Sequence, residues 1–384
     1  MRALVLFVAT IYFTASAYAA TCPNGETCFF VTENGSGLKN GSTWANSFAG
    51  LPFSGTHRYE TALRVANLSR GATYYIADGT YPGYYFTNAG GGTSFITIKK
   101  ATIADHGVGA GITDPGWSNA MGDGEAVFQS GGAAIWLFAP STHYYHFNGQ
   151  IGSGKAPGGY GFRLYSTASR AGSSKMVTID TTGTYADVGD VTNIILEHIE
   201  FDWNNGTSAG PCTANSIIEV RGSKPNGYWT IANNYFHHAA GGAIYLRYTG
   251  LGHFTVNNNY LQLMGDETSS GDCPGSPDHA HWETFWFTGI DDLVFSNNTL
   301  EDAYPAGLTG WVMLGGVSNA KIYNNLFFCS NASRCSPGGN GIIASWSADT
   351  NQNIRIYHNT FVDLFNGGHY LFEKGSGLDR KSVV

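Results

Sequence analysis

A short pattern of apolar and polar residues recurs along the second half of the chain. It reads apolar residue, any residue, Asn or His, Asn, any residue, apolar residue. Copies occur at 231–236, 256–261, 295–300, 322–327 and 356–361, with a degenerate earlier copy at 196–201. The alternation around each Asn pair predicts strands.

The spacing of the copies points to a stacked coil. They start 35, 25, 39, 27 and 34 residues apart. Propeller blades would be more even, whereas a solenoid tolerates uneven insertions because each coil contacts only its neighbours. One Asn can adopt the left-handed conformation that a turn needs. The other can stack its amide on those above and below. We therefore predict an all-β, right-handed parallel β-helix.

Other segments complete the expected coil. A second strand, flanked by glycine, lies between successive Asn motifs, so each coil has at least two strands. These strands are expected at 242–247, 282–288, 310–315, 341–347 and 368–374. Residues 56–68 carry the only good amphipathic helix pattern, and we expect this helix to cap the open N-terminal end of the core. The 12% charged residues and 52 glycines favour short strands and many turns over helical folds.

The two ends of the chain carry other signals. Residues 1–20 predict a signal peptide, with Arg2, an apolar stretch and a small-x-small cleavage pattern ending at Ala19. That stretch is too short to span a bilayer comfortably, so we expect secretion and no membrane anchor. The last residues, 379–384, resemble translated adapter DNA. We expect a β-helix domain of residues 21–378, truncated at its C-terminus and followed by a non-native tail.

Charge and cysteine content set the context. The formal net charge of −8 disfavours nucleic acid as a partner and repels an anionic glycan unless a cation or basic patch offsets it. We expect a monomer. Export into an oxidising compartment favours disulfides. The six cysteines suggest pairs Cys22–Cys28 and Cys329–Cys335, which leave Cys212 and Cys273 to join two distant loops.

The N-terminal region resembles a known class of proteins. The stretch FFVTENGSGLKNGSTWANSFAG (29–50), followed by RGATYYIADGTY (70–81), is similar to the opening of many secreted pectin-lyase-like proteins. With the Asn motifs, the resemblance covers most of residues 29–373. It implies the fold only, because this scaffold carries lyases, epimerases, hydrolases, esterases and non-catalytic surface proteins.

A second resemblance concerns residues 217–250, which are similar to part of the alginate lyase and chondroitinase B family. It implies Lys224 as the base, Arg247 as an aid to the leaving side and Glu219 as a calcium ligand, with Arg221 beside them as a substrate contact. The sequence departs from the family pattern by the order Ser-Lys and by Ile217, where a second acidic ligand is expected. In such a lyase a cation neutralises the uronate carboxylate while the base removes the C5 proton. The alternative is a set of exposed basic side chains on adjacent coils.

The widest gap between Asn motifs holds an acidic insertion at 263–283. Its carboxylates suit calcium, and its histidines could act as acid or base. The candidate calcium ligands are Asp266, Glu267, Asp278 and Glu283, and the candidate acid–base residues are His279 and His281. A disulfide between Cys212 and Cys273 would hold this loop against the face that carries Arg247. A solvated loop with at most a structural ion is the alternative.

Tryptophans on the second expected strand offer sugar-binding faces. Trp286, Trp311 and Trp346, like Arg247, precede the next Asn motif by similar distances, so they should fall near one column. Inward packing is the alternative. Taken together, the sequence favours a secreted polysaccharide lyase that cleaves a uronate-containing glycan by β-elimination. A non-catalytic carbohydrate-binding or surface β-helix protein remains open.

Overall fold

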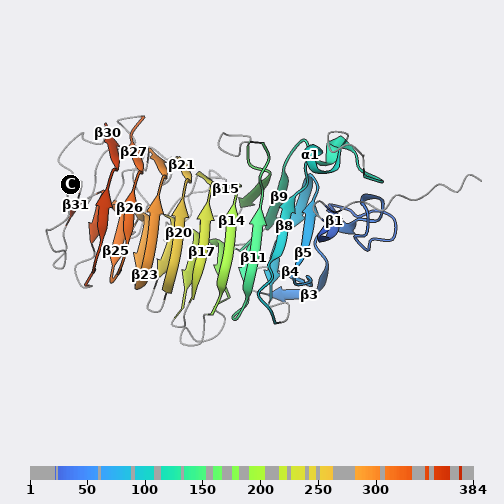
Figure 1. The fold of residues 1–384 in the computed structure, drawn as a ribbon, viewed down its shortest axis with the longest axis horizontal. Coiled ribbons are helices and arrows are strands. Elements are labelled where there is room, and N and C mark those ends of the chain that lie inside the picture. The colour runs from blue at the N-terminus through green and yellow to red at the C-terminus, as the bar shows by residue number, and fades with distance from the viewer. Residues whose placement is uncertain are drawn as a thin grey trace, which may run out of the picture.

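The computed structural model describes residues 22, 25–58, 62–87, 91–107, 114–130, 134–152, 159–166, 175–180, 190–203, 216–222, 226–237, 242–247, 251–262, 282–302, 308–330, 342–345, 350–363 and 372–373. In this part of the chain the strands form three long sheets, here called A, B and C. The coils stack along one axis, and each sheet runs along that axis (Figure 1). Neighbouring strands in each sheet come from successive coils and run parallel, apart from one hairpin. The predicted all-β parallel β-helix is confirmed.

From residue 72 onward each coil contributes one strand to each sheet, in the order A, C, B, whereas the strands before it belong to sheets A and B. Sheet A contains β2 (Phe48–Ala49), β1 (Thr27–Thr32), β5 (Ala72–Ile76), β8 (Ile96–Lys100), β11 (His143–Asn148), β14 (Thr192–Glu197), β17 (Asn226–Ala232), β20 (Leu251–Asn257), β23 (Ile290–Ser296), β26 (Lys321–Tyr323) and β29 (Arg355–Tyr357). Sheet C contains β6 (Gly79–Pro82), β9 (Ala126–Ser130), β12 (Phe162–Ser166), β15 (Ile199–Trp203), β18 (Tyr235–His237), β21 (Tyr260–Gln262), β24 (Thr299–Glu301), β27 (Leu326–Phe328) and β30 (Thr360–Val362).

Sheet B carries the second kind of strand that the sequence predicts. It contains β3 (Phe53–Arg58), β4 (Ala62–Ala66), β7 (Tyr84–Phe86), β10 (Trp136–Phe138), β13 (Lys175–Ile179), β16 (Ser216–Arg221), β19 (Gly242–Arg247), β22 (Trp282–Thr288), β25 (Leu308–Gly315), β28 (Ile343–Ser345) and β31 (Phe372–Glu373). The described helical turns are α1 (Ile103–His106), η2 (Trp44–Asn46) and η4 (Asn119–Met121). None of the described helices is long and apolar enough to cross a membrane.

The core runs through the middle of the coils. Apolar side chains at matching positions lie one above another, as Ile231, Val256 and Phe295 do on β17, β20 and β23. All three are buried. On the core side of sheet C, Phe201 of β15 stacks on Phe236 of β18 with ring centroids 4.6 Å apart. Burial of each such side chain contributes about 1.5–3 kcal/mol to folding.

The Asn pairs fill the two roles that the sequence predicts for them. The first Asn of each pair has a left-handed backbone, with φ of 55–58° at Asn233, Asn258, Asn297 and Asn324. The second forms a buried ladder, in which each side-chain amide donates to the next. The ladder runs from Asn234 through Asn259, Asn298 and Asn325 to Asn359, with Nδ2–Oδ1 distances of 2.9–3.1 Å. In the coils that the ladder joins, the turns from sheet A to sheet C are thereby fixed.

The predicted capping helix over residues 56–68 is wrong. This segment lies in an antiparallel hairpin of β3 and β4, and β4 pairs parallel with β7 at the edge of sheet B. The hairpin packs Leu63 against Ala134 and Leu137 on the outer side of that sheet. Pairing with an existing sheet edge satisfies the backbone and outweighs the weak helical preference of the segment.

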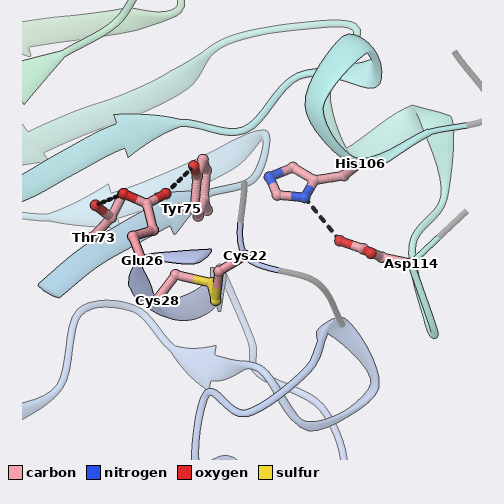
Figure 2. The surroundings of a disulfide bond; sticks show 7 residues. All are labelled: Cys22, Glu26, Cys28, Thr73, Tyr75, His106 and Asp114. Carbon is pink, nitrogen blue, oxygen red and sulfur yellow. Dashed lines mark hydrogen bonds and ion pairs between the residues drawn. A yellow bond between two sulfur atoms is a disulfide. The ribbon is translucent and has the colours of Figure 1, made fainter. Parts of the chain in front are cut away.

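A second, smaller core covers the outer face of β1 and β5 near the N-terminal end. Here His106 is buried, and its Nδ1 lies 2.9 Å from Asp114 Oδ2 (Figure 2). Its ring packs against Trp44, Tyr75 and Trp117. Burial lowers the pKa of His106, and the nearby Asp114 carboxylate opposes that shift. α1 and η4 thus lie beside the first coils, on this smaller core.

Disulfides among the described residues agree with the predicted secretion. The predicted Cys22–Cys28 bond is present beside Glu26, which accepts hydrogen bonds from Thr73 and Tyr75 (Figure 2). Cys329 is disulfide-bonded as well. Cys212, Cys273 and Cys335 lie outside the described residues, so their pairing stays a prediction.

Candidate functional site

Charged side chains gather on the outer face of sheet B, over β13, β16 and β19, with Trp286 of β22 beside them. Strand alternation directs Ile218 and Val220 into the core and therefore directs Glu219 and Arg221 outward. The parallel register places Glu219 beside Tyr245, which in turn lies beside Trp286. Arg221 and Arg247 are likewise neighbours in register. The resemblance-based candidates Glu219, Arg221 and Arg247 are thus together in space.

Glu219 lies at the centre of this cluster. Its side chain is 1% exposed, and Lys175 Nζ lies 3.1 Å from its Oε2. Arg221 donates to Oε1 through Nε, and Arg247 Nη1 lies 3.8 Å from the same oxygen. Among the described residues, three cationic side chains thus surround one carboxylate. A buried carboxylate needs such partners, and basic side chains clustered in this way attract an anion.

An aromatic pair borders the cations. The Arg247 guanidinium carbon lies 3.7 Å from the centroid of the Trp286 ring, which is a cation–π contact. Tyr245 meets the same ring edge-on, with centroids 5.6 Å apart. Trp286 therefore holds Arg247 beside Glu219 and adds a planar apolar surface to a charged site.

The sequence missed two members of this cluster. Tyr245 could have been found, because it lies two residues before Arg247 and so on the same face of a strand. Lys175 gave no usable signal, since it follows a Gly/Ser-rich stretch and precedes the first Asn motif. Its position beside Glu219 depends on the parallel pairing of β13 with β16.

The other predicted site residues have different outcomes. Trp311 is 6% exposed and packs against Phe327 in the core, which is the inward alternative. The expected single column also fails, since Trp286 pairs in register with Tyr245 and not with Arg247. Glu283 lies in β22, but its side chain is not among those described. Outside the described residues lie Lys224, Asp266, Glu267, Asp278, His279, His281 and Trp346.

The positive side chains around Glu219 also disfavour its predicted role as a calcium ligand. Its two carboxylate oxygens already face Lys175, Arg221 and Arg247. A divalent cation bound there would be repelled by three positive side chains at short range. The geometry therefore favours Glu219 as the group that gathers the cations.

A second charged cluster lies on the outer face of sheet C. Ligand-type atoms of Glu200, Asp202 and His237 all lie within 4.8 Å of one another. Arg163 already donates to Asp202, and its Nε lies 3.6 Å from Glu200. His237 Nε2 is 2.8 Å from Glu200. Because the guanidinium already supplies the positive charge, we assign no metal to this cluster.

Comparisons with known proteins give only distant likenesses. No family model matches the chain, and no curated protein matches it. Among solved structures, it is similar to an alginate lyase from Paenibacillus sp. strain FPU-7, with 12% identity, a TM-score of 0.45 and coverage of 80% of this chain and 92% of that one.

Two further likenesses are weaker. A lacto-N-biosidase from Eubacterium ramulus has 12% identity, a TM-score of 0.36 and coverage of 91% of this chain and 67% of that one. The enzymatically active domain of bacteriophage CBA120 tailspike protein 2 has 7% identity and a TM-score of 0.27, over 77% of this chain and 38% of that one. At such values the likenesses carry no argument about substrate. The assignment as a parallel β-helix protein therefore rests on the chain's own three sheets.

Proposed function

We propose that the chain is a secreted polysaccharide-active protein that binds an acidic glycan on the outer face of sheet B. The observation that carries the proposal is the convergence of Lys175, Arg221 and Arg247 on the single carboxylate of Glu219. In a chain of net charge −8, these clustered basic side chains give an anionic sugar a place to bind.

The favoured reaction is β-elimination at a uronate. Arg247 and Arg221 neutralise the uronate carboxylate, which stabilises the negative charge that develops when C5 loses its proton. Lys224, three residues beyond Arg221 in the sequence, takes that proton as the base. The C5–H electrons form the C4–C5 double bond, and the glycosidic oxygen leaves C4 with the electron pair of the C4–O bond and takes a proton from water. Glu219 acts as a positioning residue for both arginines.

Arg247→Ala tests the role of the cluster. We expect at least about 100-fold lower formation of unsaturated product from alginate or polygalacturonate, because a preorganised charge at the reacting carboxylate is lost. Ultraviolet absorbance of the new double bond measures the product. Arg355→Ala, at an exposed arginine of β29, is the matched control and should keep full activity.

The outcomes separate the two candidate functions. If the wild type releases no unsaturated product from any polyuronate, the lyase reading is excluded. Polyuronate binding that is lost in Arg247→Ala would then support the non-catalytic alternative. If activity in Arg247→Ala equals that of the wild type, the cluster is not the site.

Calcium at the acidic insertion remains part of the proposal. Asp266, Glu267, Asp278 and Glu283 would hold the ion, which would offset the negative charge of that loop toward an acidic glycan. Calorimetric titration with calcium chloride of the wild type and of a variant carrying Asp278→Ala and Glu283→Ala tests it. No heat of binding in the wild type would contradict the proposal.

A further inference from the structure

The outer face of sheet A carries an open groove of about 290 Å³, on a different side of the coil from the sheet B cluster. Its floor consists of short, β-branched side chains at matching positions of successive strands. These residues are Ile195, Thr230, Thr255 and Val294. One wall consists of the residues two positions earlier on the same strands, Asn193, Tyr228, His253 and Asp292, of which Tyr228 and His253 are longer than the floor residues. Short residues beside long ones produce the hollow.

Tyr228 dominates this wall. It is 57% exposed, which is unusual for a large ring in the described part of the chain. One side of the ring stacks on His253, with centroids 4.5 Å apart and planes 18° apart. His253 Nδ1 in turn lies 2.8 Å from Asp292 Oδ2. The imidazole is therefore oriented by a carboxylate and supports the tyrosine, so the exposed ring is held in place.

The backbone at these positions argues against a purely structural role. Tyr228 and His253 have φ of 56° and 58°, in the left-handed region. Side chains with a Cβ pay about 1–2 kcal/mol there, and Asn or Gly is tolerated best. The neighbouring coils do carry Asn193 and Asp292 at this position. An aromatic residue that is both exposed and conformationally unfavourable adds little to folding, which points to a function.

The lining of the groove selects its ligand. A rigid aromatic face with hydroxyl, amide and carboxylate groups beside it is suited to a sugar ring, which presents an apolar face and a rim of hydroxyls. Asp292 of β23 lines the groove, with His253 of β20 as its basic neighbour and Asp291 next to it in the sequence. Hydrogen bonds from Asn319 and Ser318 lower the pKa of Asp291, so it stays ionised. An acidic border disfavours uronates.

We propose that this groove binds a neutral polysaccharide chain lying along the axis of the coil, independently of the sheet B site. Successive strands are about 4.8 Å apart, which is close to the length of one pyranose unit. Consecutive sugars can therefore meet equivalent positions on consecutive coils, with Tyr228 stacking on one ring and Asp292 accepting from hydroxyls of another. The groove would anchor the protein on a mixed polysaccharide while the cationic cluster takes acidic segments.

Tyr228→Ala is the primary test, with native affinity electrophoresis in gels containing xylan, galactomannan or hydroxyethyl cellulose. We expect roughly tenfold weaker retention by the neutral polymer that retards the wild type, because one stacking contact is lost. Tyr228→Asn should lose the same binding while folding at least as well, since Asn suits the left-handed backbone. This second variant separates binding from stability.

Two controls make the result specific. Tyr323→Ala removes a half-buried tyrosine of the same sheet that stacks on Tyr357 outside the groove, and it should bind like the wild type. Arg247→Ala should also keep neutral-polymer binding. The proposal is overturned if the wild type is retarded by none of the neutral polymers, or if Tyr228→Asn is retarded as strongly as the wild type. It is equally overturned if Tyr228→Ala weakens binding to alginate instead.

Discussion

Sheets A and B are built on the same parallel coils, yet their outer faces differ in chemistry. On sheet B, Glu219 is buried beneath three cationic side chains. On sheet A, Asp292 is 46% exposed and pairs with a single histidine that is also half exposed. The same backbone thus supports a desolvated, positively charged cluster on one side and an open, aromatic groove on another. Side-chain length and charge, and not the fold, decide what each face can bind.

The largest expected difference is in stability. Glu219→Gln should lower the free energy of unfolding by about 3–5 kcal/mol, because buried cations lose their counter-charge. Asp292→Asn should change it by at most about 1 kcal/mol, since its ion pair is exposed. Urea denaturation followed by fluorescence measures both. Equal effects of the two substitutions would remove the contrast between the faces.

A second prediction concerns the turn that borders sheet A. Asn298→Ala should cost about 2–3 kcal/mol, because it removes the acceptor of Asn259 and the donor to Val256 and Asn325 within the core. Asn297→Ala, at the exposed left-handed position, should cost about 1 kcal/mol. Thermal unfolding ranks the two. A smaller effect at Asn298 than at Asn297 would mean that the ladder does not stabilise the sheet A edge.

Salt should affect glycan binding differently at the two faces. Retention by alginate at sheet B should weaken severalfold as sodium chloride is raised, because ions screen the attraction between the cluster and the glycan. Retention by a neutral polymer on sheet A should stay nearly constant. Affinity electrophoresis at two ionic strengths measures this, and an equal response of both polymers would contradict the division into two sites.

The smallest expected effect is the pH dependence of stability at the Glu197–His146 pair on sheet A. Burial would raise the pKa of Glu197, but the hydrogen bond and charge of His146, 2.6 Å away, outweigh it and hold the pKa below its ordinary value of 4.5. The pair therefore adds stability above that value and loses it as the pH falls further. Glu197→Gln should cost less than about 1 kcal/mol at pH 7, and the difference should vanish in acid. A difference independent of pH would refute this account.

The sequence predicted those features that repeat. The Asn motifs gave the parallel β-helix, both conformational roles of the two asparagines and the second set of strands. It also placed Glu219, Arg221 and Arg247 near one another, through a resemblance to a family of lyases. The repeats are visible in the sequence because each coil packs its apolar side chains against its neighbours in the same way.

Features that depend on one particular neighbour were missed. The hairpin of β3 and β4 forms because an edge of sheet B is available, which a helical pattern over 56–68 cannot reveal. Lys175 reaches Glu219 only through the register between β13 and β16. Tyr228 lines a groove because its backbone is left-handed and the residues beside it are small. Each of these requires knowledge of what lies on the next coil.

The asparagine ladder has a consequence for how such a protein can change over generations. In the five coils that it joins, each turn from sheet A to sheet C has two residues, so length variation is excluded from that corner there. In these coils the segments that lead into sheet B strands vary in length, from residues 238–241 at the shortest to residues 263–281 at the longest. Insertions can therefore accumulate beside the charged cluster while the ladder keeps each coil in register. New substrate preferences could thus be acquired one loop at a time, without a renewed search for a stable fold.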